Sequence, residues 1–349
     1  MVFMQFSEIL TRWYSVNKRS LPWRETIDPY RIWLSEIILQ QTQVAQGLPY
    51  YEVFSSQYPT VFDLAEAEER EVLKLWQGLG YYSRARNLHA TAKYVVSEFN
   101  GVFPNNYKDL LKLKGVGDYT ASAIASICFN EATAVVDGNV YRVLSRYFGM
   151  ETPINTTAGA RAFKALAQEL IDRAKPALFN QAIMEFGARQ CRPKNPDCSV
   201  CPLQEGCVAL GTDKIDMLPV KLKAAKVKKK HFNFLVFISN DGKTILEQRK
   251  DKGIWQNLYQ FPLIETAKAV TATQIKMLLN EHDFLINKTF EISLYNKEVI
   301  VHKLSHQHLY TKFWIVEVDD LGDNGIFTQD IHKYAVPVLI GNFIEAFNF

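Results

Sequence analysis

The sequence predicts a chain of two unlike parts, an all-α region over residues 1–211 and an α+β domain over residues 231–349. Apolar residues recur with the helical period of 3.6 through the first part. In the second part, short runs rich in β-branched and aromatic residues alternate with turn residues. Between them, the segment 212–230 holds 7 Lys and 2 Asp and lacks an apolar face, which is typical of a linker.

Helices of the first part follow one another with short breaks at Gly, Pro and Asn residues. The apolar repeats indicate helices over Tyr30–Gln46, Glu71–Gly78, Ala85–Phe99, Tyr119–Phe129, Val140–Phe148, Ala158–Arg173 and Phe179–Gln190. These segments are long enough to pack as a helical bundle.

The second part is expected to form a sheet with one helix. Strands are indicated over His231–Ser239, Thr244–Gln248, Glu291–Tyr295, Val299–Leu304 and Phe313–Val318, and a helix near Ala272–His282. The turn residues Asn240-Asp241-Gly242 lie between the first two strands, as in a hairpin.

Composition excludes several classes of protein. Of the 349 residues, 48% are hydrophobic and 22% are charged, which excludes a disordered chain, a collagen and a coiled-coil rod. The net charge is +3, and because the linker carries +5, the other residues sum to −2. Any binding of nucleic acid must therefore use local patches or backbone amides.

Neither end of the chain suggests a membrane or an export signal. No run of 18 apolar residues occurs, and the N-terminus lacks a basic region followed by an apolar one. We therefore expect a monomer in the cytoplasm, of the bacterial nucleoid-associated type or otherwise intracellular.

Four of the five cysteines lie within 17 residues, with the spacing Cys-x6-Cys-x2-Cys-x5-Cys. They are Cys191, Cys198, Cys201 and Cys207. Four thiolates in one short loop can hold a single tetrahedral ion or a cubane cluster. Structural zinc usually uses two close cysteine pairs, and only one such pair is present. The spacing therefore favours a 4Fe–4S cluster over zinc.

The segment 113–121 has two glycines around one apolar residue, directly before a helix. Gly115, Val116 and Gly117 would form the turn of a helix–hairpin–helix, whose free N–H groups can hold a phosphate. Many helix–helix turns use glycine for geometry alone, so this motif by itself fits a plain turn equally well.

Together with the cysteine spacing, the hairpin resembles that of the endonuclease III superfamily of DNA glycosylases. The segments 21–24, 34–43 and 136–140 narrow the resemblance to the adenine DNA glycosylase family, of the MutY type. The resemblance implies a helix–hairpin–helix glycosylase fold with an iron–sulfur loop. Its six-helix part would span about 22–130, and its iron–sulfur part would combine 1–21 with 131–211. A Nudix-like domain would follow.

Glu36 is the candidate general acid. Isoleucines adjoin it on a helix, and Leu39 and Gln40 stand at the positions where an ion-pairing Lys or Arg would lie. Burial would raise its pKa and suit it to donate a proton. The alternative is a surface glutamate paired with some lysine. The resemblance implies that Glu36 protonates N7 of adenine.

Asp137 precedes a predicted helix start, where free N–H groups favour a carboxylate anion. Plain N-capping is the alternative to a catalytic role. An anion facing a neutral acid is the pairing that cleaves glycosidic bonds through an oxocarbenium-like state. The resemblance assigns Asp137 to stabilising that cation and includes Asn139 in the substrate site.

Tyr119 distinguishes two branches of the superfamily. Members that also cut the DNA carry a lysine at this position, whose amine forms a Schiff base with the abasic sugar. A tyrosine hydroxyl can only hydrogen-bond. The resemblance therefore implies a monofunctional glycosylase.

Further residues match the family's substrate contacts. The resemblance implies that Gln181 binds the flipped adenine and that Gln41 and Tyr81 penetrate the duplex. Arg24 would line the pocket or contact a phosphate. Surface or core roles are the alternatives for Gln41 and Tyr81.

In the second part, Leu304, Ser305 and His306 match a Phe-Ser-His turn that the family places at the lesion, with leucine in place of the aromatic residue. The segment 253–262 also resembles the family's recognition domain. No Gly-x5-Glu-x7-Arg-Glu helix occurs, so we expect no nucleotide hydrolysis there.

The resemblance implies a DNA repair enzyme that flips out and excises adenine opposite 8-oxoguanine or guanine without strand cleavage. Its partner would be double-stranded DNA with that mispair, and its cofactor a 4Fe–4S cluster. The alternatives are an endonuclease III-like glycosylase/lyase acting on damaged pyrimidines and a non-catalytic iron–sulfur protein that binds DNA or transfers electrons.

Overall fold

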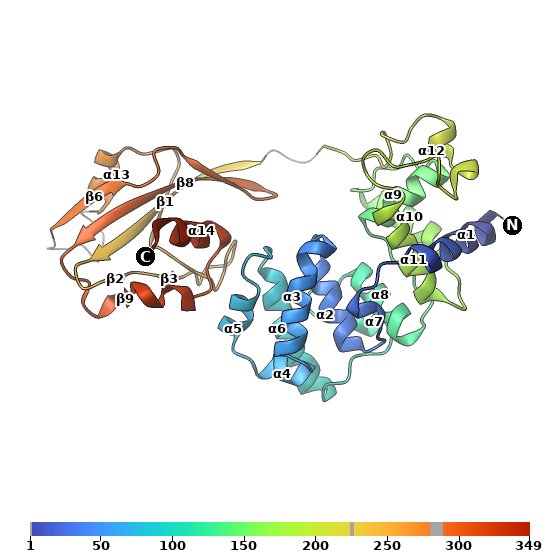
Figure 1. Cartoon of the computed structure of the whole chain (residues 1–349), viewed down its shortest axis with the longest axis horizontal. Coiled ribbons are helices and arrows are strands. Elements are labelled where there is room, and N and C mark those ends of the chain that lie inside the picture. Colours follow the sequence, from blue (N-terminus) through green and yellow to red (C-terminus); the bar gives the residue numbers. More distant parts are fainter. Residues whose placement is uncertain (1, 224–226, 280–288) are drawn as a thin grey trace. The chain divides into compact units, whose positions relative to one another are not determined.

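The computed structural model describes residues 2–223, 227–279 and 289–349. The chain divides into two compact units (Figure 1). Unit 1 comprises Met1–Glu66 and Asn87–Lys223, and unit 2 comprises Ala67–Arg86 and Ala224–Phe349. Unit 1 is helical, and unit 2 contains the sheet. Among the described helices, none combines the length and the apolar character that crossing a bilayer requires.

The helices before residue 212 largely follow the predicted order. They are α1 (Val2–Asn17), α2 (Pro29–Leu39), α3 (Val44–Gln57), α4 (Val61–Glu66), α5 (Glu69–Leu75), α6 (Ser83–Phe99), α7 (Tyr107–Leu110), α8 (Asp118–Phe129), α9 (Gly138–Phe148), α10 (Thr157–Leu170), α11 (Pro176–Arg189) and α12 (Val208–Gly211). Short 3-10 helices, η1 (Pro22–Arg24) and η2 (Gln204–Gly206), add single turns.

The predicted helix over residues 30–46 is wrong in one respect, because it breaks in the middle. Helix α2 starts at Pro29, with Asp28 capping it through a 3.0 Å bond from the Tyr30 N–H. It ends where Gln40 turns to ψ 116° and Gln41 takes a left-handed φ of 54°. Helix α3 resumes at Val44. Neither glycine nor proline marks this break in the sequence.

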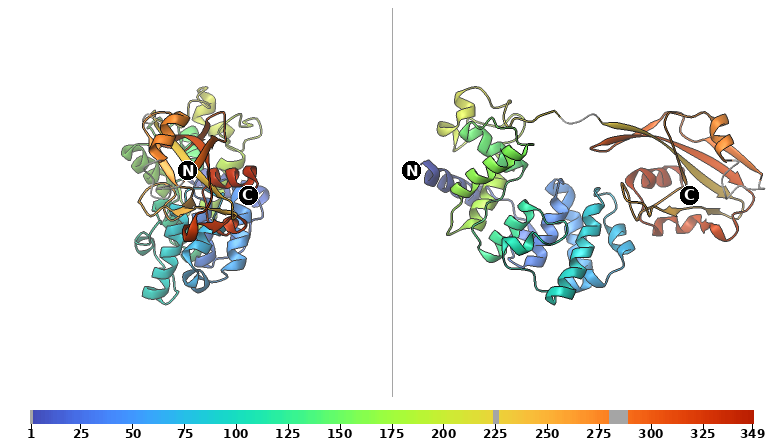
Figure 2. Two further views of the ribbon diagram at one scale, coloured as in Figure 1. Left: turned by 90° about the vertical axis from the view of Figure 1, so that its left-hand side faces the viewer. Right: turned by 180° about the vertical axis from the view of Figure 1, so that it is seen from behind.

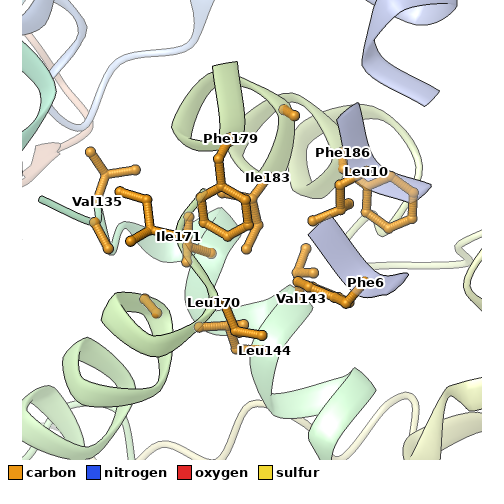
Figure 3. Close-up of a cluster of buried hydrophobic side chains, with 14 of the residues drawn as sticks. Phe6, Leu10, Val135, Val143, Leu144, Leu170, Ile171, Phe179, Ile183 and Phe186 are labelled. Atoms are coloured by element: carbon orange, nitrogen blue, oxygen red, sulfur yellow. The ribbon is translucent and has the colours of Figure 1, made fainter. Parts of the chain in front are cut away.

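Helix α1, which the sequence analysis did not predict, completes a core with the last helices of unit 1. Phe6 and Leu10 lie one turn apart and are both fully buried. They pack against Ile183 and Phe186 of α11, with residues of α9 and α10 beside them (Figure 3). Phe6 and Leu10 of α1 thereby hold in place α11, the helix that carries Gln181.

Unit 2 is built on a sheet in the order β5-β1-β8-β6, with β7 also paired to β8. Strands β1 (Lys228–Ser239) and β8 (Gln307–Val318) are parallel along their whole length. The others, β5 (Leu263–Thr266), β6 (Phe290–Leu294) and β7 (Ile300–Lys303), are antiparallel to their neighbours. Two small ribbons pair β2 (Lys243–Thr244) with β9 (Ile326–Phe327) and β3 (Glu247–Gln248) with β4 (Tyr259–Gln260).

One helix covers each face of the sheet (Figure 2). Leu235 and Trp314 pack with α13 (Ala272–Leu279) on one face. On the other, the Phe313 ring stacks 4.0 Å from Phe343 of α14 (Val338–Phe347). Residues 280–282 of the predicted helix lie outside the described residues.

Strand β1 begins three residues earlier than predicted. Lys228–Lys230, expected in the linker, pair with Gln307–Leu309 of β8. The linker predicted over 212–230 therefore ends inside the sheet.

Candidate active site

Glu36 lies on α2 with only 8% of its surface exposed, because almost the whole helix is buried. The pKa of Glu36 is raised to about 7. Burial is the largest cause, the charge of Asp137 acts in the same direction, and a hydrogen bond with Tyr119 opposes them. The prediction that this carboxyl is buried and has a raised pKa is confirmed. At neutral pH a large fraction of it carries a proton.

Tyr119 is the second residue of α8 and meets Glu36 from the hairpin. Its hydroxyl donates to the Met184 sulfur at 3.1 Å and also lies in hydrogen-bonding range of the Glu36 carboxyl. Burial and the two neighbouring carboxyls keep the Tyr119 pKa well above its ordinary value. The phenol therefore stays neutral beside the Glu36 carboxyl.

Asp137 caps α9, as predicted. Its Oδ1 accepts from the Asn139 and Val140 N–H groups at 2.9 and 2.8 Å, and the Asn139 side chain donates to Oδ2 at 2.7 Å. Burial raises the pKa of Asp137, and these hydrogen bonds oppose the rise. Both polar atoms of the Asn139 amide bind protein groups, since its Oδ1 accepts from Arg142 at 2.9 Å. A substrate contact of Asn139 stays a prediction.

Gln181 of α11 is oriented by a residue that the sequence analysis missed. The Tyr14 hydroxyl, on α1, donates to Gln181 Oε1 at 2.8 Å. Tyr14 is only 3% exposed. A hydroxyl donor at the oxygen fixes which end of the amide faces away from it. The Nε2 group of Gln181 is thus directed elsewhere, which suits a side chain that reads a base edge.

Arg24 is held by a buried carboxylate one turn from Gln181. Glu185, which is 1% exposed in its side chain, accepts from Arg24 at 2.8 Å and from Arg19 at 2.6 Å. The Arg24 guanidinium also lies 5.5 Å from the Tyr14 ring. Because Arg24 is committed to this cluster, its contact with substrate stays a prediction. The sequence could have indicated that Glu185 belongs to this region, because it stands four residues after Gln181 and therefore lies on the same face of the helix.

The predicted hairpin forms between α7 and α8. Gly115 has a left-handed φ of 81°, and a Cβ there would meet the Asn87 Cβ at 2.9 Å, so glycine is required. The first amides of α8 have no acceptor within the helix. Asp118 beside them is paired with Lys164 at 2.9 Å and accepts from the Tyr107 hydroxyl at 2.5 Å. The negative charge of Asp118 is thereby compensated, and the free N–H groups can donate to a phosphate.

Comparisons with known proteins agree with this geometry. Residues 34–179 match the HhH-GPD superfamily of base excision DNA repair proteins, and residues 233–346 match the NUDIX domain. An adenine DNA glycosylase of Buchnera aphidicola is 34% identical over 322 residues, covering 90% of this chain and 87% of that protein. The human adenine DNA glycosylase is 46% identical over 213 residues, covering 58% of this chain and 39% of that protein.

The chain belongs to the adenine DNA glycosylase family. A solved structure of a thermostable thymine-DNA glycosylase also matches it, with a TM-score of 0.56 and 31% identity. That match covers 60% of this chain and 97% of the other chain. The fold predicted for both parts of the chain is confirmed, a helical HhH-GPD domain and a mixed α/β NUDIX domain.

The two residues expected to penetrate the duplex share an unusual backbone. Gln41 has a φ of 54° and Tyr81 a φ of 48°, both in the left-handed region that side chains rarely adopt. Gln41 is exposed, and Tyr81 is 50% exposed. Strained, exposed residues of this kind are concentrated at functional sites. Penetration of the duplex by Gln41 and Tyr81 stays a prediction.

The four cysteines of the 191–207 loop are free thiols. Burial raises the pKa values of Cys198, Cys201 and Cys207, and the neighbouring charge of Cys191 also raises them. In the described part of the chain, no three Cys, His, Asp or Glu side chains are close enough to hold one metal ion. Ligation of a four-iron cluster by these four cysteines stays a prediction.

Two buried arginines, missed by the sequence analysis, connect this loop to α9. Arg146 donates to the Cys191 sulfur at 3.4 Å and to the Arg192 carbonyl at 2.7 Å. Arg142 donates to the Cys191 carbonyl at 2.6 Å and to Asn139 at 2.9 Å. The cation beside the sulfurs would stabilise thiolates. Through Arg142 the loop also supports the residue that holds Asp137.

The predicted lesion-recognition turn joins β7 and β8. The Leu304 N–H donates to the Gln307 carbonyl at 2.9 Å, which closes the turn. Ser305 and His306 are exposed at its tip, with Ser305 Oγ 3.4 Å from His306 Nδ1.

Proposed function

We propose that the chain is a monofunctional DNA repair glycosylase that removes adenine facing 8-oxoguanine or guanine in double-stranded DNA. The observation that carries the proposal is the meeting of Glu36, Tyr119 and Asp137 from three separate helices. Family membership supplies adenine as the base and DNA as the partner.

The chemistry divides between two carboxyl groups. Glu36, with a pKa of about 7, donates a proton to N7 of the flipped adenine and makes the base a leaving group. Asp137, held by N–H groups at the start of α9, stabilises the positive charge that develops on the sugar. Gln181, fixed by Tyr14, binds the edge of the adenine. Arg24, beside the Tyr14 ring, lines the pocket for the adenine.

Strand cleavage is not part of the proposed reaction. A lyase step needs a nucleophilic amine at the abasic sugar. Tyr119 stands at the hairpin position that would supply it, and a neutral phenol forms no Schiff base. The abasic site is therefore the product.

Binding and recognition are assigned to three places. The backbone N–H groups at Gly115, Val116 and Gly117 hold a phosphate. Gln41 and Tyr81 occupy the gap in the base stack from which the adenine has been flipped out. The turn of Leu304, Ser305 and His306 reads the base opposite, through the Ser305 hydroxyl and a His306 ring nitrogen.

Cys191, Cys198, Cys201 and Cys207 would hold a 4Fe–4S cluster. Such a cluster fastens the 191–207 loop against Arg146 and needs no part in proton transfer. Purified protein should be brown and contain about four irons per chain. Stoichiometric zinc without visible absorbance would contradict this assignment.

The deciding experiment uses duplexes with adenine opposite 8-oxoguanine, guanine or thymine, and one with a damaged pyrimidine. We expect abasic sites opposite 8-oxoguanine and guanine, with strands that break only after alkali or heat. Excision of the damaged pyrimidine with direct nicking, or a borohydride-trapped adduct, would instead support a lyase. No excision from any duplex would support a non-catalytic binding protein.

A further inference from the structure

A row of basic side chains crosses three strands of the sheet in unit 2. Lys229 of β1 is the register partner of His308 in β8, and His308 is in turn the partner of Lys303 in β7. Partners in adjacent strands project from the same face. Lys229, His308 and Lys303 therefore form one transverse row, although 74 positions separate the two lysines in the sequence.

The row is exposed and its positive charge is not neutralised. Lys229 and Lys303 are both exposed, and neither has an acidic partner among the residues that the structure describes. The next row carries His231 and Tyr310, whose rings stack 5.2 Å apart, with the Lys229 ammonium 5.8 Å from the Tyr310 ring.

The neighbouring lysine provides a contrast. Lys230 projects from the opposite face, because side chains alternate along a strand. It is paired with Glu265 at 2.7 Å. Two adjacent lysines of one strand thus differ in face and in partner.

The row lies directly at the base of the turn 304–306. Lys303 precedes Leu304, and the Lys228 N–H donates to the His306 carbonyl at 3.2 Å. Figure 1 shows the beginning of β1 running beside the β7–β8 hairpin. Any DNA that reaches this turn brings its sugar–phosphate backbone close to the row.

We propose that Lys229 and Lys303 bind the phosphodiester backbone of the DNA that carries the opposite base. The inference rests on the proposed function only in taking duplex DNA as the partner. A lysine ammonium is a point charge on a flexible stem, and it suits phosphates better than base edges. The row therefore adds affinity and positions the turn, while the turn supplies the choice of base.

The test measures binding as a function of salt, by fluorescence anisotropy on the full-length protein between 50 and 300 mM KCl. The duplexes carry adenine opposite 8-oxoguanine or guanine, and an undamaged duplex is included. The variants are Lys229→Ala with Lys303→Ala, the matched control Lys230→Ala, and Lys229→Arg with Lys303→Arg. Thermal melting checks that each variant is folded.

Each lost phosphate contact lowers the slope of log affinity against log salt by about 0.9. We expect the double alanine variant to lose about 1.8 in slope and about tenfold or more in affinity at 100 mM salt, equally for all three duplexes. The arginine pair should keep the slope, and Lys230→Ala should leave it unchanged.

An unchanged slope in the double alanine variant would overturn the inference and leave the row as a surface for an acidic protein. An equal fall in Lys230→Ala would also overturn it, since the effect would then follow bulk charge. A loss confined to the 8-oxoguanine duplex would assign the row to base recognition instead. Excision by the unsubstituted protein tests the proposed function separately, because binding requires no turnover.

Discussion

Unit 1 contains two buried glutamates whose acidities differ greatly. Glu36 is 8% exposed on α2, and Glu185 is 1% exposed on α11. Burial raises the pKa of Glu36 to about 7, and no cation is among the groups that affect it. Burial would raise the pKa of Glu185 too, but hydrogen bonds from Arg19 and Arg24 bring it to about 2. The two sites differ in their partners rather than in their depth.

The difference in pKa suits the two carboxyl groups to different roles, one as a proton donor and the other as a permanently charged partner for arginine. A carboxyl that must give up a proton near neutral pH needs burial without a cation. A carboxylate that holds an arginine needs the cation and never takes up a proton in the physiological range. In the proposed reaction Glu36 is the acid, whereas Glu185 holds Arg19 and Arg24 in place.

The largest effect should come from removing the reactive pair. We expect Glu36→Gln and Asp137→Asn each to slow single-turnover adenine excision by about a thousandfold or more, because proton donation or cation stabilisation is lost while shape is kept. DNA affinity should change little. The exposed Glu8→Gln is the matched control. Excision within tenfold of the unsubstituted protein would remove the residue from the mechanism.

The second effect concerns stability. Glu185→Gln should lower the free energy of unfolding by about 3 kcal/mol at pH 7, because it leaves Arg24 with an unpaired buried charge. Since the folded-state pKa of Glu185 is depressed, this stabilisation is present above about pH 4.5 and is lost as the pH falls toward 2. Urea unfolding measures it, with the exposed Glu169→Gln as control. Equal midpoints would contradict a structural role.

A third prediction concerns pH. Excision should fall about tenfold per pH unit above 7, because the donor form of Glu36 disappears. It should also fall at acid pH, as Asp137, whose pKa is raised above its ordinary value, becomes protonated. Glu185 stays ionised throughout this range. Single-turnover rates between pH 5 and 9 give the profile, and a flat line from 6 to 9 would exclude Glu36 as the acid.

The smallest effect should come from the residue that joins the two sites. Tyr14→Phe keeps the ring beside Arg24 but removes the hydrogen bond that orients Gln181. We expect adenine excision to slow about fivefold, the value of one neutral hydrogen bond. An adenine analogue in which carbon replaces a ring-nitrogen acceptor other than N7, at the edge that faces Gln181 Nε2, should be affected less. An equal loss for both bases would mean that Tyr14 acts only through packing.

Much of the molecule could be predicted from the sequence. Helical and strand periods indicated both domains, and the cysteine spacing with the hairpin glycines indicated the family. Burial of Glu36 followed from the lack of a cation at the next helical turn. Such signals are local, so one segment of sequence contains them.

The remainder depends on contacts between distant segments. The helix break at Gln41, where φ is 54°, has no Gly or Pro in the sequence to mark it. Tyr14 and Gln181 are 167 residues apart. Lys229 and Lys303 come together only through the parallel pairing of β1 with β8. No periodicity within one segment contains this information.

The packing of α1 against α11 has a consequence for folding during synthesis, because the two helices are made at different times. The first helix leaves the ribosome with an apolar face whose main partner, 167 residues further on, does not yet exist. At ordinary rates of translation, that interval lasts about 8 to 33 seconds. During this time Tyr119 lacks the helix that carries its partner Met184, so the surroundings of Glu36 are incomplete in a truncated or stalled chain. The contacts of Phe6 and Leu10 with Ile183 and Phe186 therefore form only after α11 has been synthesised.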